Sequence, residues 1–131
     1  MTPRPTITFA KLAAPKKGSA LILAGDDLSL SPVAASCDPA GRVARSFAIS
    51  GFKGAFGASS ELLAPEGSPL DRITVLGVGK PDLLKDYSWL RIGGAAAAAF
   101  RGRGEVTVLA ELDGTPVGAA EAAAIGAGIL L

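Results

Sequence analysis

The stretch Arg72-Ile-Thr-Val-Leu-Gly-Val78 predicts the fold most directly. It is β-branched or apolar over almost its whole length, which is typical of a strand covered on both faces of a sheet. Gly79-Lys80-Pro81 follows and ends the strand, because proline has no backbone N–H to donate. A helix is then predicted from Asp86 to Phe100, since its larger apolar residues recur at intervals of three and four: Trp89, Ile92, Ala96 and Phe100.

Outward from this centre, apolar patterning and turn residues predict further elements on both sides. Strands are expected at Thr6–Leu12, Ser19–Ala24, Ser59–Leu63 and Glu105–Glu111. Helices are expected from Asp38-Pro39 to Ser50, with Gly51 as C-terminal cap, and from Pro116 to Leu131. This alternation predicts an α/β three-layer sandwich, with a mostly parallel or mixed sheet flanked by helices. One domain is expected over residues 6–131, after a loose tail at residues 1–5.

Two glycines interrupt the helix predicted at Asp86–Phe100. Gly93 and Gly94 each cost about 1 kcal/mol relative to alanine in a helix interior. This loss is understandable if another backbone packs closely against the helix there.

The last predicted helix is apolar almost all round. Glu121 is its only charged residue, and no glycine, cationic or proline stop signal follows Ile129-Leu130-Leu131. A helix of this kind is usually buried. We therefore expect the chain to be the N-terminal piece of a longer protein that supplies the covering surface.

Composition narrows the possible functions. The 131 residues include 13 basic and 12 acidic side chains, for a net charge of +1, so no global field favours nucleic acid. The chain has no histidine, which excludes Ser-His-Asp and Cys-His catalysis and the common zinc sites within it. One cysteine, a polar N-terminus unlike a signal peptide, and no apolar run near the ~20 residues of a membrane span predict a cytoplasmic protein.

Gly77-Val78-Gly79-Lys80 is the strongest candidate for a phosphate-binding loop, and its neighbours argue against one. A dinucleotide fingerprint requires a third glycine where Asp82 stands. A Walker loop requires glycine at Thr74 and a hydroxyl residue at Pro81. The segment is interpreted as a strand-to-loop turn.

The remaining candidates also favour structural roles. Asp26-Asp27 is interpreted as a solvated turn rather than a cation site, and Cys37 as a small packed side chain. Tyr87 and Trp89 are predicted to anchor the core rather than to stack on bases. A scattered set of basic residues is interpreted as solvated surface: Lys16, Lys17, Lys53, Arg101 and Arg103.

Four segments, in order and spacing, resemble the N-terminal domain of the leucyl (cytosol) aminopeptidases. They are Gly51-Phe-Lys-Gly54, Val75-Leu-Gly-Val-Gly-Lys-Pro81, Arg91-Ile-Gly-Gly-Ala-Ala-Ala97 and Glu121-Ala-Ala-Ala-Ile-Gly-Ala-Gly-Ile-Leu-Leu131. The resemblance extends from about Thr6 to the end of the chain.

The resemblance implies a macro-domain-like fold and a catalytic domain that lies C-terminal to this one. It also implies two divalent metals, zinc or manganese, held in that second domain, and a hexameric parent. The family's metal-site signatures, Asn-Thr-Asp-Ala-Glu-Gly-Arg and Lys-Gly-Ile-Thr-Phe-Asp-Ser-Gly-Gly, do not occur in this sequence. No catalytic, cofactor or metal residue is therefore assigned here.

The leading hypothesis is a non-catalytic domain that supports oligomer assembly and shapes access to the parent's active site. Its expected partners are its own catalytic domain and further copies of itself. Two alternatives remain: a macro-like module that binds ADP-ribose or a related nucleotide through Gly77–Pro81, and a DNA-contacting domain that uses Arg42, Arg45 and Lys53. Neither a membrane nor nucleic acid is the expected partner.

Overall fold

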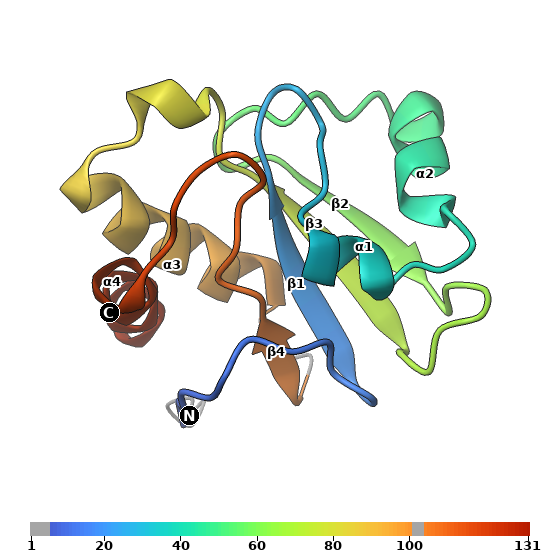
Figure 1. Ribbon diagram of the computed structural model, residues 1–131, viewed down its shortest axis with the longest axis horizontal. Helices are drawn as coiled ribbons and strands as arrows, with labels where there is room; N and C mark the ends of the chain where they lie inside the picture. The colour runs from blue at the N-terminus through green and yellow to red at the C-terminus, as the bar shows by residue number, and fades with distance from the viewer. Residues whose placement is uncertain (1–5, 101–103) are drawn as a thin grey trace.

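The computed structural model describes residues 6–100 and 104–131 (Figure 1). The expected tail at residues 1–5 lies outside this part. The strands are β1 (Ser19–Ala24), β2 (Ser59–Leu63), β3 (Arg72–Gly77) and β4 (Val106–Val108). The helices are α1 (Pro32–Ser36), α2 (Arg42–Ser50), the 3₁₀ turn η1 (Pro81–Leu83), α3 (Asp86–Phe100) and α4 (Ala119–Leu130).

The four strands form one mixed sheet in the order β2-β3-β1-β4. The central strand β1 is parallel to both neighbours, with Ser19 opposite Arg72 of β3 and Val106 of β4. The edge strand β2 is antiparallel to β3. The α/β class and the mixed, mostly parallel sheet predicted from the sequence are therefore confirmed.

Side chains of β1 alternate between two hydrophobic clusters on opposite faces of the sheet. Ala20, Ile22 and Ala24 join the cluster that contains Val43 and Phe47 of α2. Leu21 and Leu23 join the cluster that is covered by α3 and α4. Both faces of the strand are thus buried, which explains its unbroken apolar sequence. Figure 1 shows the resulting layers, with α1 and α2 on one side of the sheet and α3 and α4 on the other.

Helices α3 and α4 pack with their backbones in close approach. A Cβ built on Gly93 would lie 2.1 Å from the carbonyl oxygen of Ile125, and one on Gly128 would lie 2.1 Å from that of Leu90. The close packing predicted from the paired glycines is confirmed at Gly93. A Cβ on Gly94 meets nothing within 4 Å, so the second glycine has no such packing reason.

The prediction of a strand at Thr6–Leu12 was wrong. The segment is irregular in the structure, although Ile7 packs partly against the α3–α4 cluster. Its alternating residues fit a strand, but it forms no ladder with any strand of the described chain.

Three other predicted boundaries were wrong by a few residues. The strand predicted at Glu105–Glu111 is limited to β4. The terminal helix begins at Ala119 rather than Pro116, where the Glu121 side chain accepts a hydrogen bond from the Gly118 N–H at 3.2 Å. The helix predicted from Pro39 begins at Arg42.

Asp38 fixes that later start of α2. Its two carboxylate oxygens accept hydrogen bonds from the N–H groups of Arg42 (2.9 Å) and Val43 (2.8 Å). The aspartate thus satisfies two donors of the first helical turn, as a cap does, while residues 39–41 form a turn before the helix. The predicted cap at Gly51 is confirmed, because this residue adopts the left-handed conformation with φ 75°.

Helix α1 was missed. Ser31 caps it by accepting a hydrogen bond from the Ala34 N–H, and Pro32 occupies its first position. Serine followed by proline is a recognised start signal, but the helix is only five residues long.

Candidate functional site

The loop Gly77–Pro81 lies at the carboxyl ends of β1 and β3, where α/β sheets commonly bind ligands. Three of its backbone donors are already used. Gly77 N–H donates to the Ala58 carbonyl (2.7 Å), Val78 N–H to that of Ala24 (2.9 Å), and Gly79 N–H to that of Gly54 (2.8 Å). A phosphate cradle needs such N–H groups free to face the ligand. The bonds favour the structural turn that the sequence predicts.

The glycines around this loop are explained by close packing of three segments. A Cβ on Gly77 would lie 2.2 Å from the Ala55 carbonyl oxygen, and one on Gly54 would lie 2.3 Å from that of Gly25. These distances are impossible for a real Cβ, so only glycine fits. Two of the sequence segments that carry the family resemblance therefore interlock, Gly51–Gly54 with Val75–Pro81.

Asp26 and Asp27 are exposed and belong to a turn. Asp27 accepts a hydrogen bond from the Ser29 N–H at 3.1 Å, and Asp26 lies 3.9 Å from the Lys80 ammonium in an exposed ion pair. The interpretation of this pair as a solvated turn is supported.

Cys37 is buried beside Ala34 and Val43, as predicted for a small packed side chain. Burial raises the pKa of the Cys37 thiol, and the negative charge of Asp38 raises it further. A nucleophilic cysteine requires a lowered pKa, so this environment does not activate the thiol.

The basic residues of the described chain are exposed or paired with acidic side chains. Lys16 and Lys53 are exposed, and Lys17 lies 3.8 Å from Glu105. Arg42 forms an ion pair with Glu66, while Arg45 is exposed on α2. Arg101 and Arg103 lie outside the described residues. Arg42, one of the three cations on which the DNA alternative depends, thus already has an acidic partner.

The two aromatic residues at the start of α3 differ. Trp89 is buried in the α3–α4 cluster, as predicted. The prediction that Tyr87 anchors the core was wrong, because its side chain is 62% exposed. Two residues along a helix correspond to a rotation of about 200°, so Tyr87 and Trp89 point to opposite faces.

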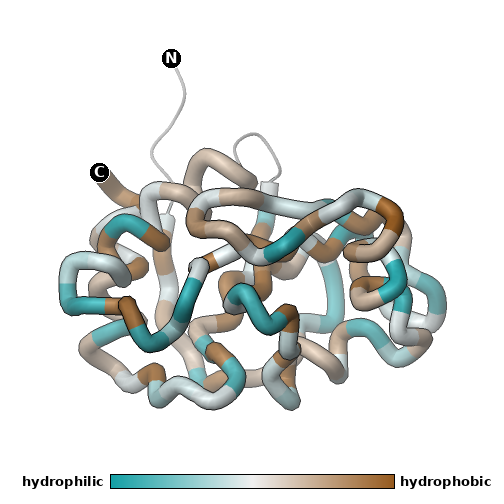
Figure 2. The backbone as a smooth tube through the Cα atoms, turned by 90° about the horizontal axis from the view of Figure 1, so that it is seen from above, coloured by the Kyte–Doolittle hydropathy of each residue, from teal (hydrophilic) through white to brown (hydrophobic). Residues whose placement is uncertain are grey.

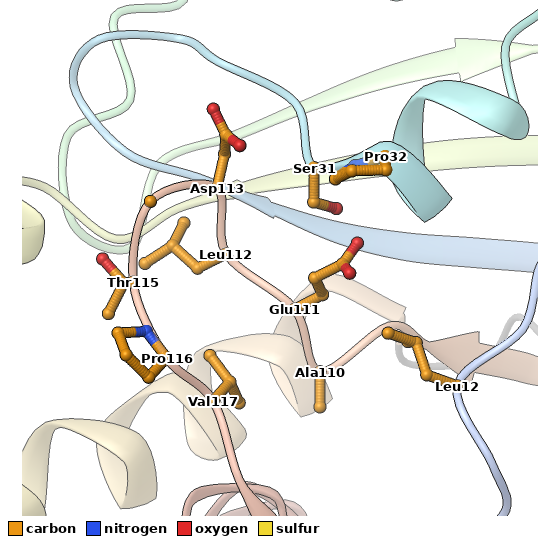
Figure 3. A pocket seen from close by; sticks show the side chains of 11 residues that line it. Leu12, Ser31, Pro32, Ala110, Glu111, Leu112, Asp113, Thr115, Pro116 and Val117 are labelled. Atoms are coloured by element: carbon orange, nitrogen blue, oxygen red, sulfur yellow. The ribbon is translucent and has the colours of Figure 1, made fainter.

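A pocket of about 420 Å³ lies beside the loop between β4 and α4 (Figure 3). Glu111 and Asp113 bring two carboxylates to it, and sequence reasoning did not select either residue. Glu111 accepts a hydrogen bond from the Val33 N–H at 3.2 Å, so this carboxylate supports the first turn of α1. Both residues could have been selected from the sequence by their position just after a predicted strand.

A larger groove of about 810 Å³ runs between β4, α4 and the segment at residues 6–13. Its lining is mostly apolar and includes Phe9, Val108, Ile125 and Ile129. In Figure 2 the tube has the brown colour of apolar residues at its C-terminal end, and the Leu131 side chain is almost fully exposed.

The described residues do not fit the metal pair that the resemblance implies for the parent. Over residues 6–100 and 104–131, no three His, Cys, Asp or Glu side chains gather in a group that could hold a metal ion. In the same ranges, no helix is long and apolar enough to span a bilayer.

The structure is thus an α/β domain with a mixed sheet. The candidate residues described above contribute mainly to packing and to turns. The model of the cytosol aminopeptidase family, N-terminal domain, matches residues 21–131. The chain therefore belongs to the cytosol aminopeptidase family, as its N-terminal domain.

Relatives named probable cytosol aminopeptidase match along almost the whole chain. That of Chelativorans sp. (strain BNC1) is 52% identical over 131 residues, which cover 100% of this chain and 26% of the relative. That of Agrobacterium fabrum is 37% identical over 126 residues, and that of Brucella anthropi 36% identical over 132 residues. They cover 95% and 100% of this chain, and 25% and 26% of those relatives. The chain thus spans about a quarter of the length of these relatives.

Proposed function

We propose that this chain is the non-catalytic N-terminal domain of a cytosolic leucyl aminopeptidase. In this proposal the domain supports assembly of the oligomer and shapes access to an active site that lies in a C-terminal domain. The observation that carries it is the match of residues 21–131 to the N-terminal-domain model of the family.

The parent protein would remove N-terminal amino acids from peptides. Its chemistry would depend on two divalent metals, zinc or manganese, in the C-terminal domain. The parent would be a hexamer in the cytosol, and the fold of the present domain would be of the macro-domain type. The names of the relatives and their greater length support this assignment.

Apolar exposure supports a structural role within a larger assembly. Phe9 and Leu12 are exposed by 64% and 42%, and both line the apolar groove. Large exposed apolar side chains that lie close together are typical of surfaces that contact another protein surface.

The assembly role is tested by removing the domain from a longer protein. The Chelativorans relative is expressed whole and without the region that matches residues 21–131. We expect the whole protein to sediment as an oligomer. At the same concentration, the shortened protein should sediment as a species with fewer subunits. Circular dichroism of the shortened protein serves as the folding control.

An unchanged oligomer in the folded, shortened protein would contradict the assembly role.

A further inference from the structure

Helix α3 leaves one of its faces uncovered in the described chain. Trp89 and its neighbours on the inner face belong to the α3–α4 cluster. The opposite face is made of four exposed residues at intervals of three and four: Tyr87, Arg91, Gly94 and Ala98. Residues at these intervals lie one above another along a helix. These four residues are called the outer face of α3.

The outer face lacks the polar residues of a helix that borders water. From Ile92 to Phe100 the sequence contains no polar side chain. The outward side of a surface helix is usually charged or polar. A Cβ on Gly94 meets nothing within 4 Å, so packing within the described chain does not explain this mid-helix glycine, which costs about 1 kcal/mol relative to alanine. Both observations are expected of a helix face that another surface covers.

Arg91 gives this face its charge. The guanidinium carbon Cζ lies 4.5 Å from the centroid of the Phe56 ring, close enough for the cation and the ring to attract each other. Within residues 6–100 and 104–131, no acidic side chain forms an ion pair with Arg91. A guanidinium presents a fork of N–H donors that matches a carboxylate. Phe56 thus holds a cation in place on the outer face without neutralising it.

Apolar side chains flank this cation. Tyr87 lies one helical turn before Arg91 and is 62% exposed, and Leu83 of η1 is 68% exposed. Tyrosine and arginine are among the residues that contribute most to protein interfaces. The surface therefore fits a partner that offers apolar contacts and one carboxylate.

We propose that the outer face of α3 is the docking surface for the C-terminal part of the longer protein, and that a carboxylate of that part pairs with Arg91. The matched 131 residues make up only 26% of the Chelativorans relative, so a large remainder of the protein is available as the partner. Tyr87 contacts apolar residues of this partner, while Gly94 and Ala98 allow its backbone to approach closely. The inference rests on the proposed function and names the surface through which the domain acts.

The charge of the outer face argues against a second copy of the same face as the partner. In a two-fold contact the same patch is used on both sides. Such a contact would bring two Arg91 side chains to one small interface whose outer-face residues include no acid. Like charges brought together in an interface are costly.

Cysteine alkylation tests whether the face is covered. Ala98→Cys is made in this chain and in a fusion in which this chain replaces the matched region of the Chelativorans relative. Mass spectrometry follows position 98 separately from Cys37, which is buried. We expect alkylation at position 98 to be about tenfold or more slower in the fusion, because a packed interface excludes the reagent. Ala48→Cys, at an exposed alanine of α2, is the matched control and should react at similar rates in both proteins.

Arg91→Glu tests the carboxylate partner in the same fusion. The reversed charge would face another negative group, so alkylation at position 98 should become at least about threefold faster than with Arg91. Arg45→Glu, at an exposed arginine of α2, should leave the rate unchanged. Protection that survives Arg91→Glu would show that no carboxylate pairs with Arg91 and would overturn that part of the proposal.

Equal alkylation of position 98 in this chain and in the fusion would overturn the docking surface. Protection that is lost when the fusion is diluted to single subunits would also overturn it, since another copy would then be the cover. Hydrolysis of Leu-p-nitroanilide by the fusion shows that it is folded. An active fusion with an unprotected position 98 would contradict this inference and leave the proposed function intact. If the fusion is inactive, the same cysteine is placed at the aligned position of the whole Chelativorans relative.

Discussion

At the scale of single residues, glycines are the most informative positions in this chain. Gly54, Gly77, Gly93 and Gly128 each lie so close to another backbone that a side chain would collide with it. All four belong to the segments that carry the family resemblance. These glycines stand where loops or helices pack backbone against backbone. The family resemblance therefore reflects the packing of the domain rather than a chemical site.

Gly93 and Gly94 give a matched test of this explanation. Gly93→Ala places a Cβ 2.1 Å from the Ile125 carbonyl oxygen, and we expect a loss of about 1–3 kcal/mol in the free energy of unfolding. Gly94→Ala enters open space in the same helix and should stabilise the chain by about 0.5–1 kcal/mol. Urea unfolding of the two variants measures both values. Equal effects of the two substitutions would show that α3 and α4 do not pack as described.

Sequence reasoning at this scale succeeded where local pattern decides the outcome. Trp89 and Cys37 are buried as predicted. Tyr87 was placed in the core because it is aromatic, although helical geometry turns it away from Trp89. Glu111 could not be chosen, because its hydrogen bond to Val33 spans 78 positions of the sequence.

At the scale of elements, patterning predicted the buried parts well. The bounds of β1 and α3 agree with the expected ranges, since each has a clear apolar period or run between turn residues. Those of β2 also agree, although its residues alternate between exposed and half-buried. The segment Thr6–Leu12 failed for a different reason. A strand requires a partner for its backbone, and no strand of the described chain lies beside it.

The start of α2 provides the prediction at this scale. Asp38→Ala leaves the N–H groups of Arg42 and Val43 without their carboxylate partner. We expect a loss of about 1–2 kcal/mol in the free energy of unfolding, measured by urea denaturation. Asp27→Ala is the control, because this exposed carboxylate accepts a hydrogen bond from the nearby Ser29 N–H and caps no helix of the described chain. Its effect should stay within about 0.5 kcal/mol. Equal losses would show that Asp38 does not cap the helix.

At the scale of the whole molecule, the alternation of strands and helices predicts the three layers. It does not predict that β4 lies at an edge of the sheet. β4 is an edge strand with an apolar groove beside it, and α4 presents apolar residues to that groove. Both features have a simple reason if the domain works as part of a longer chain. The open edge and the groove could therefore not be predicted from these 131 residues alone.

The central claim is that this domain does not itself cleave peptides. The most direct measurement is the hydrolysis of Leu-p-nitroanilide by the purified chain in the presence of manganese, beside the whole Chelativorans relative as a positive control. The account predicts turnover by the whole relative and none by the present chain above a protein-free blank. Manganese-dependent turnover by the purified chain would contradict it.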